Sequence, residues 1–260
     1  MNGISLSSFP VYEHPLNERI RLLLRLESLF TQFSYYSRSE GVWDSWAAVA
    51  TLINLQNLVE LSDIKSEVLR ELERQNQNLT ELHNSPQVDA IKLSDLINKL
   101  SSHVKNLVNT SGRIGHQLRS NDFLATIRQR LTIPGGTCNF DAPAYYFWLN
   151  LPAEERKKCL HDWAEPFSAL RAAIFLILDL VRNNITVLEK VAHKGFFSTS
   201  LEGITSSFQL IQILLPPTER IFPEISGGKH RVSIRFLMLD AGQHASQVNK
   251  DVRFILRCCS

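Results

Sequence analysis

Residues 126–149 read T-I-R-Q-R-L-T-I-P-G-G-T-C-N-F-D-A-P-A-Y-Y-F-W-L, and the spacing of apolar side chains changes within this segment. Up to the turn at Pro134-Gly135-Gly136, apolar residues recur at steps of three and four, and Asn121 stands where a helix N-cap is expected. This spacing predicts a helix over residues 122–131 that ends before the proline. Beyond the turn, residues 144–149 alternate between two faces, which predicts a strand. We therefore expect this segment to join a helical body to a β-rich body.

Length and composition indicate a folded protein. The chain has 260 residues, of which 44% are apolar, enough to build one large core or two smaller ones. No basic segment followed by an apolar run occurs near Met1, and the longest apolar run, Ala172 to Leu178, stops at Asp179. A membrane span needs about 20 apolar residues, so we expect a cytoplasmic protein. Reduced thiols are expected, because no C-x-x-C spacing occurs among Cys138, Cys159, Cys258 and Cys259.

Helical periodicity covers most of the first two thirds of the chain. Ile64 to Leu82 and Val88 to Val108 each carry one apolar stripe, and the short connection between them predicts an antiparallel pair. Pro166 to Val181 is almost entirely apolar, which predicts a helix at the centre of the helical body. We assign residues 16–131, with 153–184 returning to them, to a helical domain.

Strand-like segments dominate the last third. They are residues 195–201, 207–215, 231–239 and 252–258, separated by turn-forming residues. Short connections between them predict an antiparallel meander. The expected fold is therefore α+β, with an antiparallel helix bundle and a smaller antiparallel β domain formed by residues 1–15, 132–152 and 185–260.

Motifs for catalysis or metal binding do not occur in the sequence. H-E-x-x-H, G-x-S-x-G and G-x-G-x-x-G are all absent. The segment Ser226-Gly227-Gly228-Lys229-His230 ends like a phosphate-binding loop, but Pro223 stands where that loop needs glycine and His230 where it needs Ser or Thr. His161 beside Asp162 is more typical of a surface-helix histidine than of a catalytic base. We expect no enzymatic activity, no cofactor and no metal.

Positive charge is concentrated near the C-terminus. From residue 226 onward there are six Lys or Arg and two Asp, a net charge of +4, so the rest of the chain must carry −2 to give the total of +2. Alternation in residues 231–239 and 252–258 places apolar side chains on one face and basic side chains on the other. The basic residues at or beside these outward positions are Lys229, Arg231, Arg235, Arg253 and Arg257. If the two strands pair, these side chains form one basic surface that an acidic ligand could bind, whereas a solvated face with local ion pairs remains the alternative.

Short segments in order across nearly the whole chain carry a family resemblance. They are Tyr12-Glu13-His14-Pro15-Leu16-Asn17-Glu18, Leu24-Arg25-Leu26-Glu27, Glu71-Leu72-Glu73-Arg74-Gln75, Arg113-Ile114-Gly115, Arg128-Gln129-Arg130-Leu131, Ile133-Pro134-Gly135-Gly136, Phe140-Asp141, Trp148-Leu149, Leu178-Asp179-Leu180, Pro223-Glu224-Ile225-Ser226-Gly227 and Ile234-Arg235-Phe236. In these segments the chain resembles the ZapD family of bacterial cell-division proteins, which are partners of the tubulin-like FtsZ.

The resemblance implies a function. It implies a homodimer that binds the C-terminal tail of FtsZ, which mixes acidic and apolar residues, and that cross-links FtsZ filaments into bundles at the mid-cell division ring. Lys229, Arg231 and Arg235 fall on the family's tail-binding positions, and Arg25 matches a basic position in the first helix. We therefore expect a division-ring adaptor with no nucleic-acid or membrane partner.

Two departures and one alternative accompany this expectation. Other family members can carry Arg where this chain has Asp122 and His where it has Tyr146, so charged contacts at these positions are not carried over. The alternative is a nucleic-acid-binding protein that uses the same basic surface. It is disfavoured because the whole chain carries a charge of only +2 and no stacking aromatic residues alternate with the basic ones.

Overall fold

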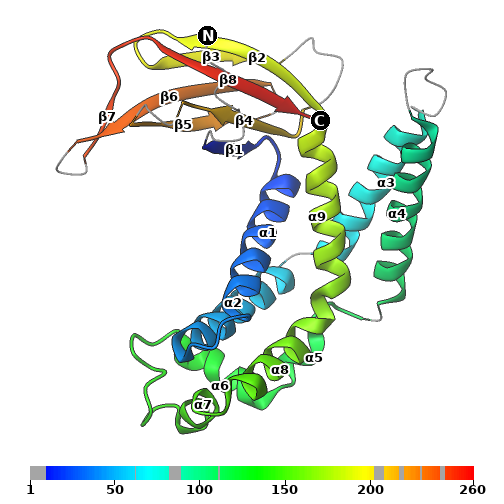
Figure 1. The fold of residues 1–260 in the computed structure, drawn as a ribbon, viewed down its shortest axis with the longest axis vertical. Helices are drawn as coiled ribbons and strands as arrows, with labels where there is room; N and C mark the ends of the chain where they lie inside the picture. Colours follow the sequence, from blue (N-terminus) through cyan, green and yellow to red (C-terminus); the bar gives the residue numbers. More distant parts are fainter. Residues whose placement is uncertain are drawn as a thin grey trace. The chain divides into compact units, whose positions relative to one another are not determined.

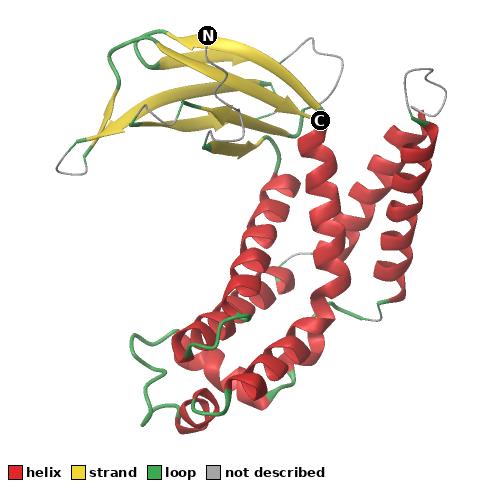
Figure 2. Cartoon of the chain, in the orientation of Figure 1, coloured by secondary structure: helices red, strands yellow, loops and turns green. Residues whose placement is uncertain are grey.

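The fold consists of a helical part and a β part (Figures 1 and 2). The computed structural model describes residues 10–61, 63–81, 89–110, 112–201, 208–216, 220–228, 230–240 and 244–260. Its contacts divide the chain into a β unit, residues 1–22 with 178–260, and a helical unit, residues 23–177, so that the division falls inside the first and last long helices. The predicted α+β class, with a helical domain and a smaller antiparallel β domain, is confirmed.

The helical unit contains most of the helices. Their bounds are α1 Glu18–Tyr36, α2 Val42–Glu60, α3 Ile64–Glu81, α4 Ala90–Asn109, α5 His116–Arg119, α6 Asp122–Leu131, α7 Pro143–Leu149, α8 Ala153–Ala164, the 3-10 turn η3 Glu165–Phe167 and α9 Ser168–Asn183. The predicted N-cap is confirmed, because Asn121 Oδ1 accepts from the Leu124 amide at 3.1 Å. Among the described residues, no helix is both long enough and apolar enough to cross a membrane.

Helices α3 and α4 form the predicted antiparallel pair and lie side by side in Figure 1. Lys65 Nζ at the start of α3 donates to the Thr110 carbonyl at the end of α4, at 2.7 Å, which fixes the opposite directions of the two helices. Their apolar stripes supply buried residues that include Val68, Leu72 and Leu100. Burial of these stripes stabilises both helices.

The predicted strand at residues 144–149 is wrong, because this segment is the helix α7. Its buried residues are Tyr145, Trp148 and Leu149, which are spaced by three and four as one face of a helix requires. The rings of Tyr145 and Trp148 stack at 5.9 Å between centroids and form a cluster with Phe123 and Trp163. Residues 132–152 consequently lie in the helical unit, not in the β domain to which the sequence assigned them.

The β unit is built from two antiparallel sheets. The strands are β1 Val11–Pro15, β2 Ile185–Ala192, β3 Phe196–Ser200, β4 Leu210–Leu214, β5 Ile221–Gly227, β6 Arg231–Leu239, β7 Ala245–Gln247 and β8 Val252–Cys259. The first sheet has the order β1-β4-β8-β2, and the second has the order β3-β6-β5 with β7 added to β6. The predicted antiparallel pairing is confirmed, but the meander is wrong, since β6 and β8 belong to different sheets.

The two sheets share one core, visible as two layers of strands in Figure 1. Inward side chains of β6, such as Ile234 and Phe236, and of β8, such as Phe254, are buried in the same cluster. The ring centroids of Phe236 and Phe254 lie 5.0 Å apart across the sandwich. Residues between these inward positions on each strand therefore face outward, on opposite sides of the sandwich.

Candidate protein-binding surface

The outer face of the second sheet carries a row of basic and polar side chains that we call the β6 face. Antiparallel register sets its members, because residues opposite each other on neighbouring strands point to the same side. Arg231 faces Ser200, Ser233 faces Ser198 and Ser226, and Arg235 faces Phe196 and Glu224. The β6 face therefore consists of Phe196, Ser198, Ser200, Glu224, Ser226, Arg231, Ser233 and Arg235.

Arg231 lies beside a small hollow at one end of this face. The hollow has a volume of about 420 Å³ and is lined by Ser198, Thr199, Ser200, His230 and Arg231. Arg231 Nε donates to Ser198 Oγ at 3.1 Å, which orients the guanidinium and leaves its remaining N–H groups available to an anion. Hydroxyl groups and an exposed guanidinium together can bind a carboxylate by charge-assisted hydrogen bonds.

Arg235 is exposed and has both an acidic and an aromatic neighbour. Its Nε lies 3.4 Å from Glu224 Oε2, and the two side chains are 60% and 56% exposed. An ion pair this exposed contributes only about 0–1 kcal/mol, so an incoming carboxylate can replace Glu224. Across the sheet on β3, Phe196 is 46% exposed and offers apolar surface beside the charge. This end of the β6 face can therefore accept a ligand that has acidic and apolar groups side by side.

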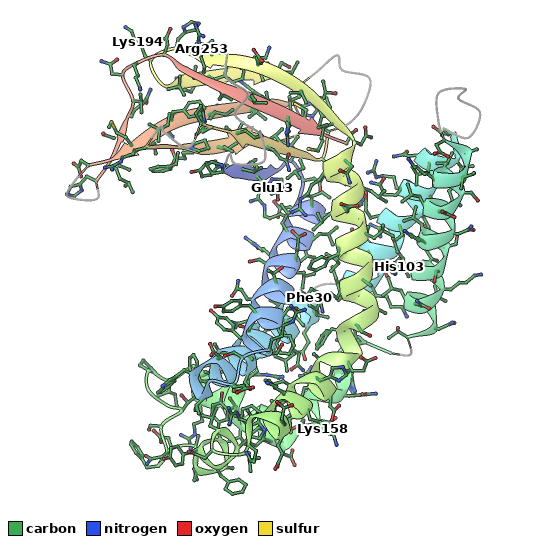
Figure 3. The ribbon with its side chains drawn as sticks, in the orientation of Figure 1. Glu13, Phe30, His103, Lys158, Lys194 and Arg253 are labelled. Carbon is green, nitrogen blue, oxygen red and sulfur yellow. The ribbon has the colours of Figure 1, made fainter. Side chains whose placement is uncertain are left out.

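The other predicted basic residues do not join this row. Arg253 and Arg257 lie on β8, in the other sheet, so the expectation that their strand pairs with β6 is wrong. Arg253 is exposed (Figure 3). Arg257 is half-buried, and its Nε has no hydrogen-bond partner within the described part of the chain. Lys229 lies outside the described residues. The two-sheet topology therefore separates Arg253 and Arg257 from Arg231 and Arg235, which the sequence pattern alone had placed on one surface.

Arg25 lies in the helical unit, on the exposed side of α1. It borders a shallow groove of about 430 Å³ between α1 and α2, whose apolar lining is Leu29, Leu58 and Leu61. The combination of one basic group with leucine side chains resembles the Arg235 end of the β6 face in chemistry. Arg25 is thus a second position where an acidic and apolar ligand could bind.

Two neighbours of the predicted arginines were missed from the sequence. Glu224 and Phe196 are separated from Arg235 by 11 and 39 residues along the chain, and only the strand register brings them together. In the sequence, the only sign of these two neighbours was that inward and outward residues alternate in β5 and β3 as they do in β6. The β6 face is therefore less purely basic than the sequence indicated.

A half-buried polar network lies on the first sheet, facing away from the shared core. Arg182, in the last turn of α9, donates to both carboxylate oxygens of Glu13 at 2.8 and 2.7 Å, and Gln212 donates to Glu13 Oε1 at 2.8 Å. Burial opposes ionisation of Glu13, but these hydrogen bonds outweigh it and keep the pKa of Glu13 below its usual value. The network fixes β1 against β4.

The cysteines and acidic residues offer no metal or thiol chemistry at this surface. Burial raises the pKa of the Cys258 thiol and, with the nearby Glu13 carboxylate, raises that of Cys259 to about 12, so both remain protonated near neutral pH. Within the described part of the chain, no group of three or more His, Cys, Asp or Glu side chains is arranged to hold a metal ion.

Comparison with known proteins defines the class to which this fold and surface belong. The family described as "ZapD: Cell division protein" matches residues 24–235, which places the chain among the cell division proteins. The cell division protein ZapD of Methylococcus capsulatus is 38% identical over 249 residues, which cover 96% of this chain and 97% of the relative. Those of two Coxiella burnetii strains, RSA 331 and RSA 493, are 40% identical over 250 residues, covering 95% of this chain and 96% of each relative. The chain belongs to the ZapD family.

Proposed function

We propose that this protein is a non-enzymatic adaptor of the cytoplasmic division ring, which binds the C-terminal tail of FtsZ through the β6 face. As a homodimer, it would cross-link FtsZ filaments into bundles. The observation that carries the proposal is the exposure of Arg231 and Arg235 on one sheet face, with Phe196 beside them. Membership of a family of cell division proteins supports the choice of partner.

The chemistry of the β6 face suits a tail that mixes acidic and apolar residues. Arg231 and Arg235 would each donate two hydrogen bonds to a carboxylate, and Phe196 would cover an apolar side chain. A few such contacts correspond to a dissociation constant near the micromolar range, or about 8 kcal/mol. Lys229 remains in the proposal because it precedes His230, which lines the hollow, in the sequence. Arg25 remains as a separate basic position. Arg253 and Arg257 are left out because they face the other way.

Dimerisation would turn this weak contact into a cross-link. A twofold dimer carries two β6 faces, and simultaneous binding of two tails can raise avidity by about 10² to 10⁴ without any new contact. The edge strand β2 favours such a dimer, because in the described structure it pairs only with β8 and exposes Ile185, Val187 and Val191. Antiparallel pairing of two β2 strands would cover both edges and satisfy twofold symmetry.

A labelled peptide with the sequence of the FtsZ tail tests the proposal. In fluorescence anisotropy, Arg231→Glu and Arg235→Glu should each weaken binding by about tenfold or more, because each replaces a charge-assisted contact with repulsion. Arg253→Glu is the matched control, since it makes the same change on the opposite outer face. Equal losses for Arg235→Glu and Arg253→Glu, or displacement of the peptide by duplex DNA, would contradict the proposal.

A further inference from the structure

A cavity in the helical unit has the lining of a small-molecule site and shares no residue with the β6 face. It has a volume of about 640 Å³ and lies between α1, α2, α8 and the start of α9. Its apolar lining is Phe30, Phe33, Leu52, Leu55, Ala164 and Phe167. Cavities of about 300–1,000 Å³ with mostly apolar walls are typical of small-ligand sites.

Basic side chains also line this cavity. Arg38, Lys157, Lys158 and Arg171 line it, and Figure 3 labels Lys158 on α8 and Phe30 on α1. The lining also holds two carboxylates: Glu154 lies 2.9 Å from Lys157 Nζ, and Glu165 accepts from the neutral Ser168 Oγ at 3.3 Å.

Three of the four cations have no such partner. Within the described structure, Arg38 and Lys158 have no carboxylate in ion-pairing range, and the Arg171 guanidinium lies over the Phe175 ring, 5.6 Å from its centroid. The Nδ1 atom of His161 lies 3.7 Å from Asp162 Oδ1. The cavity therefore combines an apolar lining with an excess of positive charge, since four cations line it against the two carboxylates of Glu154 and Glu165.

We propose that this cavity binds an amphiphilic anion, with an alkyl chain on the phenylalanine and leucine floor and a carboxylate or phosphate head group at Arg38, Lys158 and Arg171. An alkyl chain fits better than a peptide because the walls are helices, whose main-chain groups are already hydrogen-bonded and cannot pair with a peptide backbone. The negative head group would supply the counter-charge for Arg38, Lys158 and Arg171. This site is independent of the proposed tail binding.

Isothermal titration calorimetry of the full chain with sodium dodecanoate, below its micelle concentration, tests this proposal. We expect saturable one-to-one binding, and binding of the neutral octyl glucoside that is at least about tenfold weaker because it lacks the charged head. Arg171→Glu should weaken dodecanoate binding by about tenfold, and Ser34→Trp, which fills the cavity without changing its charge, should do the same. Lys105→Glu, an exposed cation on α4, is the matched control and should leave binding unchanged.

Vesicles of phosphatidylglycerol distinguish the source of the head group. Binding of free dodecanoate that depends on Arg171 indicates a soluble amphiphile, whereas co-sedimentation with vesicles that depends on Arg171 indicates a lipid head group. The proposal is overturned if neither probe binds, if octyl glucoside binds as tightly as dodecanoate, or if Lys105→Glu and Arg171→Glu weaken binding equally. Circular dichroism of each variant separates loss of the site from loss of the fold.

Discussion

At the residue scale, the pairing of Arg235 with Glu224 sets how much positive charge the β6 face presents. Alternation within β6 was enough to place Arg231 and Arg235 outward, and their exposure confirms that orientation. The carboxylate opposite Arg235 could not be predicted in the same way, because it depends on which strands pair and in which register. The sequence therefore predicts that Arg231 and Arg235 face outward, but it does not predict that Glu224 pairs with Arg235.

Glu224→Gln should strengthen binding of the FtsZ tail. Removing this carboxylate frees Arg235, and because an exposed ion pair contributes at most about 1 kcal/mol, the gain in affinity should not exceed about fivefold. Fluorescence anisotropy with the tail peptide measures it. Glu189→Gln on the outer side of β2 is the control, and a weaker rather than tighter complex for Glu224→Gln would show that Arg235 does not bind the tail.

At the element scale, α7 shows how a short segment can satisfy two periods. All six residues of 144–149 are apolar or aromatic, so alternation and helical spacing fit equally well. Pro143 decides in favour of the helix as its first residue, and packing of Tyr145 and Trp148 against Phe123 and Trp163 stabilises that choice. Those partners lie too far along the chain for a local pattern to reveal.

Strand positions were easier to predict than strand order. The segments expected at 231–239 and 252–258 correspond to β6 and β8, but the edge strands β2 and β5 were missed. A meander would have joined β6 to β8, whereas β6 lies between β3 and β5 in one sheet and β8 between β4 and β2 in the other. β5 contains Pro223 and two glycine or serine residues, which weaken any strand signal. Pairing order depends on burial of both sheets against one core, a property of the whole β unit.

The hydrogen bonds of Glu13 to Arg182 and Gln212 hold β1 in the first sheet, and their contribution to stability should depend on pH. Folding lowers the pKa of Glu13, so its ionised form stabilises the fold at pH values above the pKa of the unfolded state, about 4.3. This contribution is lost as the pH falls through the pKa of the folded state. Glu13→Gln should therefore lower the free energy of unfolding by about 1–3 kcal/mol at pH 7. The difference from the wild type should shrink steadily below about pH 4.

Urea denaturation at several pH values between 7 and 3 measures this difference. Glu189→Gln, an exposed carboxylate on β2, should show almost no difference from the wild type across the range. A Glu13→Gln penalty that stayed constant with pH would contradict an ionic role for Glu13.

At the scale of the whole molecule, bundling requires two tail-binding sites in one particle. Val187→Arg places a charge on the exposed side of β2 and should weaken a dimer formed through that edge, because two copies of the new charge would meet near the twofold axis. Sedimentation equilibrium should then show a shift from dimer to monomer, while peptide binding to each β6 face is retained. A dimer as stable as the wild type would place the interface elsewhere.

The whole-molecule arrangement also explains which parts of the site the sequence could reveal. Family segments spread along the chain indicated the ZapD family, and local alternation indicated that Arg231 and Arg235 face outward. The separation of Arg253 from Arg235 and the cavity beside Phe30 both depend on tertiary packing, so neither has a local signature. The sequence predicted features that depend on a single helix or strand, and it did not predict features formed by several elements packed together.

Light scattering of FtsZ polymers mixed with the protein is a direct test of tail binding by the β6 face. We expect that wild-type protein raises scattering, that the double variant Arg231→Glu/Arg235→Glu does not, and that Arg253→Glu behaves as wild type. We also expect no effect of wild-type protein on FtsZ lacking its C-terminal tail, and a loss of bundling as salt screens the contacts over about 8 Å. Bundling by the double variant, with circular dichroism like that of the wild type, would contradict the claim that the β6 face binds the tail.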